Sequence, residues 1–146
     1  MKIREIKIGD IDYVKSIIIM RWGVGDDYAT IEINRWLNND DNSICYIGFI
    51  DNKPMATGVF DTMSDVDYTK NAWNTLLWVE PEYRGNGYGK MMTDKRFEYA
   101  KSKGYKKVYL DTEEAEQYHL KLGWEKTKDD VSWRGAKVSI MEYDLT

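Results

Sequence analysis

Apolar and polar residues alternate with two different periodicities along the first third of the chain, one typical of a strand and one typical of a helix. Residues 2–8 alternate isoleucines with charged residues, which predicts an opening strand. Residues 11–18 place isoleucines and a valine at helical spacing, and Asp10 before them is a candidate N-cap. Two glycines in residues 22–28 break this pattern. Apolar residues at 31–36 then indicate a second, short helix.

The middle of the chain contains apolar runs that are typical of buried strands. Residues 43–50 (SICYIGFI) and 55–63 (MATGVFDTM) flank the turn 51–54 (DNKP), so this segment predicts a β-hairpin. A polar connection follows. Residues 72–79 (AWNTLLWV) are apolar almost throughout, which is typical of a central strand that is covered on both faces.

Shorter elements complete the chain. The pattern predicts a helix over 90–104 that ends at Gly104, a strand over 105–112, a short helix over 113–123, and two closing strands over 124–128 and 136–145. Glu113 and Glu114 would lie in the first turn of the short helix, where acidic residues suit the helix dipole. The order is β-α-α-β-β-β-α-β-α-β-β, so we expect one mixed α/β domain over residues 1–146 with a single sheet.

Composition and charge exclude several classes of protein. The single cysteine, Cys45, and the single histidine, His119, exclude a disulfide framework and argue against a Cys/His zinc site, so we expect no metal. Cys45 lies in an apolar strand and predicts a structural thiol. The net charge of −4 disfavours nucleic acid and anionic membranes as partners. Without a signal-peptide pattern or a membrane-spanning run, the sequence predicts a cytoplasmic protein.

The stretch 81–92 (PEYRGNGYGKMM) carries the strongest chemical signal. It fails the Walker A pattern, because Met91 stands where a hydroxyl residue is required and Arg84 where the first glycine is required. It also fails the dinucleotide fingerprint, because Lys90 or Met92 stands in place of the third glycine. A glycine-rich turn between a strand and a helix still exposes backbone N–H groups to an anion. The alternative is a turn that needed glycine for its conformation alone.

The context of this stretch resembles motif A of the GNAT superfamily of N-acetyltransferases. That motif is an apolar strand followed by Pro-x-x-Arg-x-x-Gly-x-Gly and a helix, and Pro81, Arg84, Gly87 and Gly89 fall in place within LLWVEPEYRGNGYGKMM. Residues 110–124 (LDTEEAEQYHLKLGW) are similar to motif B of the same family. Over nearly the whole chain, the resemblance implies the GNAT fold. That fold has one central mixed sheet of about seven strands, splayed at the fourth strand and flanked by about four helices.

The resemblance implies that acetyl-CoA is the co-substrate. Its pyrophosphate would lie on a loop made of Arg84, Gly85, Asn86, Gly87, Tyr88, Gly89 and Lys90. Its pantetheine arm would pair with the backbone of the splayed strand at Leu77, Trp78 and Val79. Thr112 occupies a place where the family often has an asparagine that bonds pantetheine. Helix capping is an equal explanation for that hydroxyl.

The candidates for catalysis depart from the family at one position. The family often has a tyrosine on the motif B helix that serves the departing thiolate, and here that slot holds His119, with Tyr118 one residue earlier. Adjacent helical residues point about 100° apart, so both are not expected to face one sulfur atom. His119 fits by register and Tyr118 by its proton-donating chemistry. We favour His119, keep Tyr118 beside it, and note that a surface histidine would fit the same helix.

No residue stands out as the general base. Glu80, beside the splayed strand, is our candidate, and Glu82, Asp61, Asp65 and Asp67 are alternatives to it. A chain of water molecules without a dedicated base is equally consistent with the sequence.

The acceptor pocket of this fold is usually bordered by two loops, which here correspond to residues 21–29 and 129–136. Both carry tryptophan and paired aspartates, and aromatic walls with acidic rims suit a cationic amine. The candidate acceptor residues are Trp22, Asp26, Tyr28 and Trp133.

The sequence therefore predicts an N-acetyltransferase that moves an acetyl group from acetyl-CoA to a primary amine by direct transfer in a ternary complex. The amine would belong to a small molecule, a peptide or a protein. A non-catalytic acyl-CoA-binding or sensing module with the same fold is the first alternative, and an interaction domain with a glycine turn is the second. The sequence leaves a homodimer open.

Overall fold

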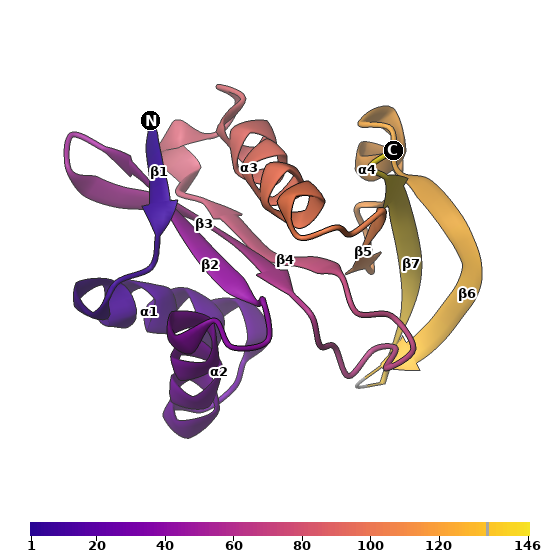
Figure 1. Ribbon diagram of the computed structural model, residues 1–146, viewed down its shortest axis with the longest axis horizontal. Helices are drawn as coiled ribbons and strands as arrows, with labels where there is room; N and C mark the ends of the chain where they lie inside the picture. Colours follow the sequence, from indigo (N-terminus) through magenta and orange to yellow (C-terminus); the bar gives the residue numbers. More distant parts are fainter. Residues whose placement is uncertain (134) are drawn as a thin grey trace.

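One mixed sheet of seven strands organises the chain (Figure 1). The computed structural model describes residues 1–133 and 135–146. Its strands are β1 (Lys2–Glu5), β2 (Ile44–Ile50), β3 (Lys53–Asp61), β4 (Trp73–Val79), β5 (Lys107–Thr112), β6 (Glu125–Trp133) and β7 (Ala136–Asp144), in the spatial order β1-β2-β3-β4-β5-β7-β6. Its helices are α1 (Ile11–Trp22), α2 (Asp26–Asn38), α3 (Tyr88–Ser102) and α4 (Glu116–Lys121). The predicted mixed α/β order is confirmed.

Helices cover the β1–β4 half of the sheet on both faces, and the alternation along β2 shows this directly. Ile44 and Tyr46 belong to the cluster that packs against α3, whereas Cys45 and Ile47 belong to the cluster under α1 and α2. Because both faces are covered, the strand is apolar at almost every position. Burial raises the pKa of the Cys45 thiol far above its ordinary value, in keeping with a structural role.

The hairpin between β2 and β3 turns more tightly than the sequence predicted. Asp51 and Asn52 both have positive φ, +51° and +63°, which is the backbone of a two-residue hairpin turn whose twist matches the strands. Lys53 and Pro54, which we expected in the turn, already pair with β2.

One predicted helix start is wrong, and one predicted N-cap residue lacks its capping bond. Glu113 and Glu114 precede α4 rather than forming its first turn, and Ala115 takes the N-cap position. Asp10 stands at the N-cap of α1 but makes no capping hydrogen bond to it. Its carboxylate instead accepts the backbone N–H of Lys7 at 2.8 Å and the guanidinium of Arg4 at 2.6 Å.

The connection between the last two strands is also much shorter than the predicted loop 129–136. β6 continues through Trp133, which pairs with Ala136 of β7. The eight-residue loop is wrong because β6 extends beside β7. Arg134, which the predicted loop included, lies outside the described residues.

β4 is bulged and then parts from its neighbour β5. Thr57 pairs with Trp78 and Val59 with Thr75, so two residues of β4, Leu76 and Leu77, stand opposite one residue of β3. Leu76 has φ +48°, which is unusual for a branched residue. On its other edge, β4 makes one registered pair with β5, Trp73 with Tyr109. Beyond that pair the two strands diverge, and the predicted splay at the fourth strand is confirmed.

A buried arginine from α3 holds the bulge. Arg96 is 2% exposed, and its guanidinium donates to the carbonyl oxygens of Val59 and Thr75, both at 3.2 Å. A Cβ atom at Gly58 would lie 3.1 Å from the Arg96 Nε, so glycine leaves the room that the guanidinium occupies. Burial lowers the pKa of Arg96 to about 9, which still leaves it charged at neutral pH.

Replacing Arg96 should therefore weaken the fold. Arg96→Met removes the donors to two buried carbonyl groups, and leaving such groups unsatisfied costs about 1–3 kcal/mol each. We expect the free energy of unfolding to fall by about 2–4 kcal/mol in urea denaturation. Lys101→Met, an exposed position on the same helix, should change it by less than about 0.5 kcal/mol. Equal stability of Arg96→Met and the parent protein would contradict this role.

Candidate active site

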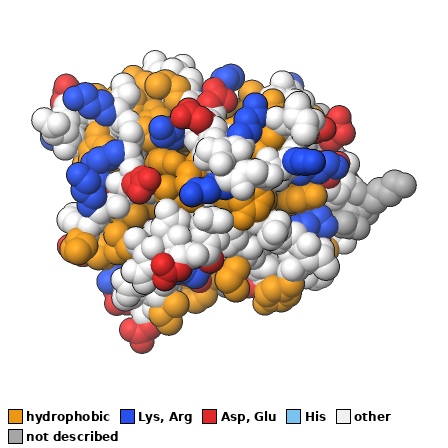
Figure 2. Space-filling model, in the orientation of Figure 1, with side chains coloured by type: hydrophobic (Ala, Val, Ile, Leu, Met, Phe, Trp, Pro, Cys, Tyr) orange, Lys and Arg blue, Asp and Glu red, His pale blue; other side chains and the backbone are white. Residues whose placement is uncertain are grey.

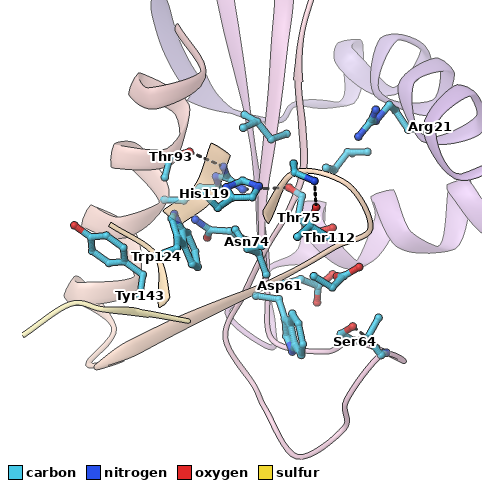
Figure 3. Close-up of a pocket in the computed structure, with 18 of the residues that line it drawn as sticks. Arg21, Asp61, Ser64, Asn74, Thr75, Thr93, Thr112, His119, Trp124 and Tyr143 are labelled. Atoms are coloured by element: carbon cyan, nitrogen blue, oxygen red, sulfur yellow. Dashed lines mark hydrogen bonds between the residues drawn. The ribbon is translucent and has the colours of Figure 1, made fainter. Parts of the chain in front are cut away.

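A cleft of about 1030 Å³ occupies the gap between β4 and β5 and opens towards both faces of the sheet (Figure 3). On one face its walls come from α3 and α4, and on the other from α1, α2 and the segment after β3. On the face shown in Figure 2, acidic and basic side chains are interspersed, so no patch of one sign covers that face. The cleft is therefore lined by residues from both faces of the sheet.

The loop before α3 carries the glycines of the predicted anion site. Gly85 and Gly87 both have φ +82°, and a Cβ atom built at either would meet nothing within 4 Å. These glycines are therefore required by the backbone conformation rather than by crowding. The loop is exposed, and Gly87 is the N-cap residue of the fifteen-residue helix α3, where unpaired N–H groups favour an anion.

Side chains of the same loop hold it to the end of β4. Arg84 donates from Nε to the carbonyl oxygen of Val79 at 2.8 Å, and its guanidinium lies 4.6 Å above the ring of Trp78. Asn86 donates from Nδ2 to the carbonyl oxygen of Tyr83 at 3.0 Å. Lys90 pairs with Asp94 at 2.7 Å, one turn along α3. The loop is thus fixed before any ligand binds.

The three strand residues predicted to meet pantetheine do not share one face. Leu77 and Val79 face α3, each 4.0 Å from where a Cβ atom of Gly89 would lie. Trp78 packs with the cluster on the opposite face. Of these three side chains only that of Leu77 lines the cleft, so Trp78 and Val79 could serve a ligand through their backbone alone.

Both residues proposed for the thiolate line the cleft, but they are exposed to different degrees. Tyr118 is 53% exposed, whereas the His119 ring is half-buried and stacks edge-on against Trp124 at 6.1 Å. His119 Nδ1 is buried and has no hydrogen-bond partner. Burial, and secondarily the charge of Arg96, lower the pKa of His119 below its ordinary 6.5. The imidazole is therefore neutral at pH 7.

Thr112 also lines the cleft, and its hydroxyl oxygen accepts the backbone N–H of Ala115 at 2.9 Å. This bond fixes the turn before α4 but does not cap the helix, whose N-cap residue is Ala115 and carries no side-chain capping bond, so the capping explanation is wrong. A hydroxyl that accepts one hydrogen bond can still donate its own proton, so the contact with pantetheine stays a prediction.

The favoured base, Glu80, is engaged elsewhere. Its Oε1 accepts the Tyr13 hydroxyl at 2.9 Å and the Trp78 indole N–H at 3.2 Å, and its side chain does not line the cleft. Burial and then Glu80 raise the pKa of Tyr13 well above its ordinary value. Glu80 therefore acts as a structural acceptor under α1 in this structure.

Two of the alternative aspartates are likewise held in ion pairs. Asp61 lines the cleft and accepts both guanidinium nitrogens of Arg35, at 2.8 and 2.7 Å, together with the Trp36 indole N–H at 3.2 Å. Asp67 pairs with Lys70 at 2.7 Å and lies outside this cleft. Glu82 is exposed and also lies outside it.

Carboxylates do gather on one wall of the cleft, and sequence reasoning missed some of them. Asp65 lies there with Asp111, Glu113 and Glu114. Burial, followed by the charges of Asp65 and Glu113, raises the pKa of Asp111. Asp111 directly follows the buried Leu110 of β5, where β5 diverges from β4. This position in the sequence could have identified it as a candidate.

Three of the four predicted acceptor residues reach the cleft. Trp22, Tyr28 and Trp133 line it. Asp26 does not, because α2 begins at this residue and its carboxylate pairs with Lys15 at 3.2 Å. The predicted nine-residue acceptor loop is reduced to the three residues between α1 and α2.

Comparison with known proteins identifies the family. The family model described as Acetyltransferase (GNAT) family matches residues 12–124. The chain belongs to the GNAT acetyltransferases. Among curated proteins it is 26% identical over 105 residues to an uncharacterized N-acetyltransferase of Methanocaldococcus jannaschii. That match covers 68% of this chain but only 46% of the relative, so the chain spans less than half of that relative's length.

Solved structures support the GNAT fold. An aminoglycoside 6'-N-acetyltransferase complexed with coenzyme A superposes with a TM-score of 0.79 at 15% identity, covering 100% of this chain and 98% of the other. A predicted acetyltransferase with acetyl-CoA from Clostridium acetobutylicum gives 0.75 at 22% identity, covering 91% and 95%.

In the described part of the chain, no group of three or more His, Cys, Asp or Glu side chains could hold a metal ion. None of the described helices is both long and apolar enough to cross a membrane.

The pKa of His119 can be tested directly, because it is the single histidine of the sequence. In an NMR titration its imidazole should have a midpoint below 6.5, and the same signal in urea should return to about 6.5. The folded state resists protonation, so stability should be lost as the pH falls below 6.5 and should not depend on this group above it. A folded-state midpoint at or above 6.5 would contradict the burial of this ring.

Proposed function

We propose that this GNAT protein is an acetyl-CoA-dependent N-acetyltransferase that acts on a primary amine by direct transfer. The observation that carries the proposal is the open edge of β4, which leads into the glycine loop at the start of α3. An unpaired strand edge can accept an extended amide chain as an added strand. The helix start beside it favours an anion, so the two features together fit a ligand with amides at one end and a diphosphate at the other.

Different segments of this chain would bind different parts of acetyl-CoA. The loop from Arg84 to Lys90 would hold the diphosphate, and the backbone of Leu77, Trp78 and Val79 would hold pantetheine. When bound, acetyl-CoA supplies an acetyl group activated as a thioester. The buried, unpaired Nδ1 of His119 supports this fit, because it lies in the cleft without a partner.

His119 would serve the departing sulfur as a hydrogen-bond donor. At neutral pH its imidazole is uncharged and carries one N–H, which can stabilise a thiolate but does not transfer a proton readily. The thiolate would then take its proton from solvent. Tyr118 is half-exposed and has the weaker claim to this role.

The acceptor would enter from the face that carries α1 and α2. Trp22, Tyr28 and Trp133 give this opening aromatic walls, and Asp65 and Asp111 give it negative charge. Both features favour a cationic amine. Asp111 replaces Glu80 as our candidate for receiving the proton of the amine, because Asp111 lines the cleft and its raised pKa suits a base.

Binding of coenzyme A tests the first half of the proposal. At a hundred times its dissociation constant, CoA should raise the free energy of unfolding by about 2.7 kcal/mol. Gly87→Ala should reduce the affinity for CoA at least tenfold in calorimetry, because a Cβ at φ +82° distorts the loop backbone. Gly104→Ala is the matched control, since Gly104 has φ +87° and an equally open environment at the far end of α3. Equal loss in both variants, or no binding at all, would refute the site.

Turnover tests the second half and separates an enzyme from a binding module. With acetyl-CoA and a panel of diamines, amino sugars and peptides, the parent protein should release free thiol. His119→Ala should lower kcat by about 10²-fold, and Tyr118→Phe should leave it within about twofold. Tight binding without turnover on any amine would favour a sensing module. A loss confined to Tyr118→Phe would reverse the roles of the two residues.

A further inference from the structure

Asn74 is a buried polar side chain without a partner. It is 8% exposed, lines the cleft, and neither Oδ1 nor Nδ2 makes a hydrogen bond in the described structure. It pairs in register with Phe60, which packs in the cluster facing α3, so Asn74 lies on that side of β4. Figure 3 draws it at the centre of the cleft, in the region of His119 and Trp124.

Nothing in the fold explains this amide. Leaving a buried amide unsatisfied destabilises a protein, and an apolar side chain of similar size would avoid that cost. The carbonyl oxygen of Thr75, the next residue of β4, already accepts a hydrogen bond from Arg96. An unsatisfied group that is retained in a cleft is best explained by a ligand that completes its hydrogen bonds.

The position of Asn74 indicates which part of the ligand it meets. It directly follows Trp73, the residue of β4 that still pairs with β5, so it lies at the closed end of the splay. The glycine loop lies at the opposite, open end. Five residue steps separate Asn74 from Val79, which is about 17 Å of extended strand, and the loop follows beyond Val79. If the diphosphate lies on that loop, an extended pantetheine arm brings the thioester to the closed end.

We propose that Asn74 is a catalytic residue whose Nδ2 donates a hydrogen bond to the carbonyl oxygen of the thioester. This inference rests on the proposed function. The amine nitrogen bonds to the carbonyl carbon while one electron pair of the C=O bond moves to oxygen, and that pair returns as the C–S bond breaks. The sulfur leaves as a thiolate and takes up one proton, and the nitrogen releases one. The products are the acetylated amine and CoA thiol.

A donor aimed at this oxygen acts most strongly as the oxygen gains charge. Removing one such donor lowers kcat by about 10²–10³-fold. The ground-state thioester gains a weaker hydrogen bond from the same donor. Acetyl-CoA should therefore bind about threefold to tenfold more tightly than CoA, which lacks that oxygen.

Calorimetry with acetyl-CoA and CoA on Asn74→Leu tests the proposal without relying on turnover. The affinity for CoA should stay within about twofold of the parent value, and the preference for acetyl-CoA over CoA should fall at least threefold. In the ligand-free protein the unfolding midpoint should stay equal or rise, because a buried unsatisfied amide is removed. With amine present, kcat should fall about 10²-fold. Asn74→Ala repeats the comparison if leucine does not pack, and Asn38→Leu, at an exposed position of α2, is the control.

The outcomes separate this inference from the proposed function. If CoA binds and the parent preference for acetyl-CoA persists in Asn74→Leu and Asn74→Ala, the role of Asn74 is overturned while the enzyme assignment stands. A lower unfolding midpoint together with weaker binding of CoA itself would mean that the amide supports the fold, which also overturns the proposal. Failure of the parent protein to bind CoA would overturn both.

Discussion

The candidate site depends on one buried guanidinium. Arg96 reaches from α3 into the sheet and satisfies backbone carbonyls of β3 and β4 on either side of the bulge. A strand that leaves its neighbour must lose the hydrogen bonds it would have made there. By supplying donors from a side chain, Arg96 compensates for that loss at the point where β4 turns, and Gly58 gives it the space to do so. The irregular pairing of β4 is therefore stabilised by specific side-chain hydrogen bonds.

The same cleft concentrates polar groups that the fold does not satisfy. Asn74 and His119 come from different elements, β4 and α4, yet their unpaired atoms line one cavity. Other polar side chains of the same cleft, Asp61 and Arg35, satisfy one another. Natural proteins break local rules of stability mainly at functional sites. The two unpaired side chains therefore support our proposal that the reaction takes place between β4 and α4.

Much of the fold could be predicted from the sequence because its signals are local. Apolar runs gave the strands, and the glycines around Gly87 gave the strand-to-helix turn. The failures at the site concern contacts between distant residues, whereas those in the fold concern the exact ends of elements. Glu80 lies beside the motif but accepts a hydrogen bond from the Tyr13 hydroxyl. Asn74 was hidden within an apolar run, and Arg96 resembled any charged residue on a helix surface. Neither spacing nor composition reveals which residues the tertiary fold will bury.

The histidine in place of the usual tyrosine is explained by these tertiary contacts. A phenol donates a hydrogen bond throughout the neutral range because its pKa is about 10, whereas a free imidazole changes charge near 6.5. Burial and the charge of Arg96 lower the pKa of His119, so at neutral pH its imidazole favours the neutral form, with one N–H, more strongly than a free imidazole does. Arg96 thus has two effects: it bonds the strands on either side of the bulge, and its charge adds to burial in disfavouring protonation of His119. In the sequence, helical register favoured His119 and proton-donating chemistry favoured Tyr118. Burial of the His119 ring removes this conflict for the proposed role, because a neutral imidazole keeps an N–H that can donate a hydrogen bond.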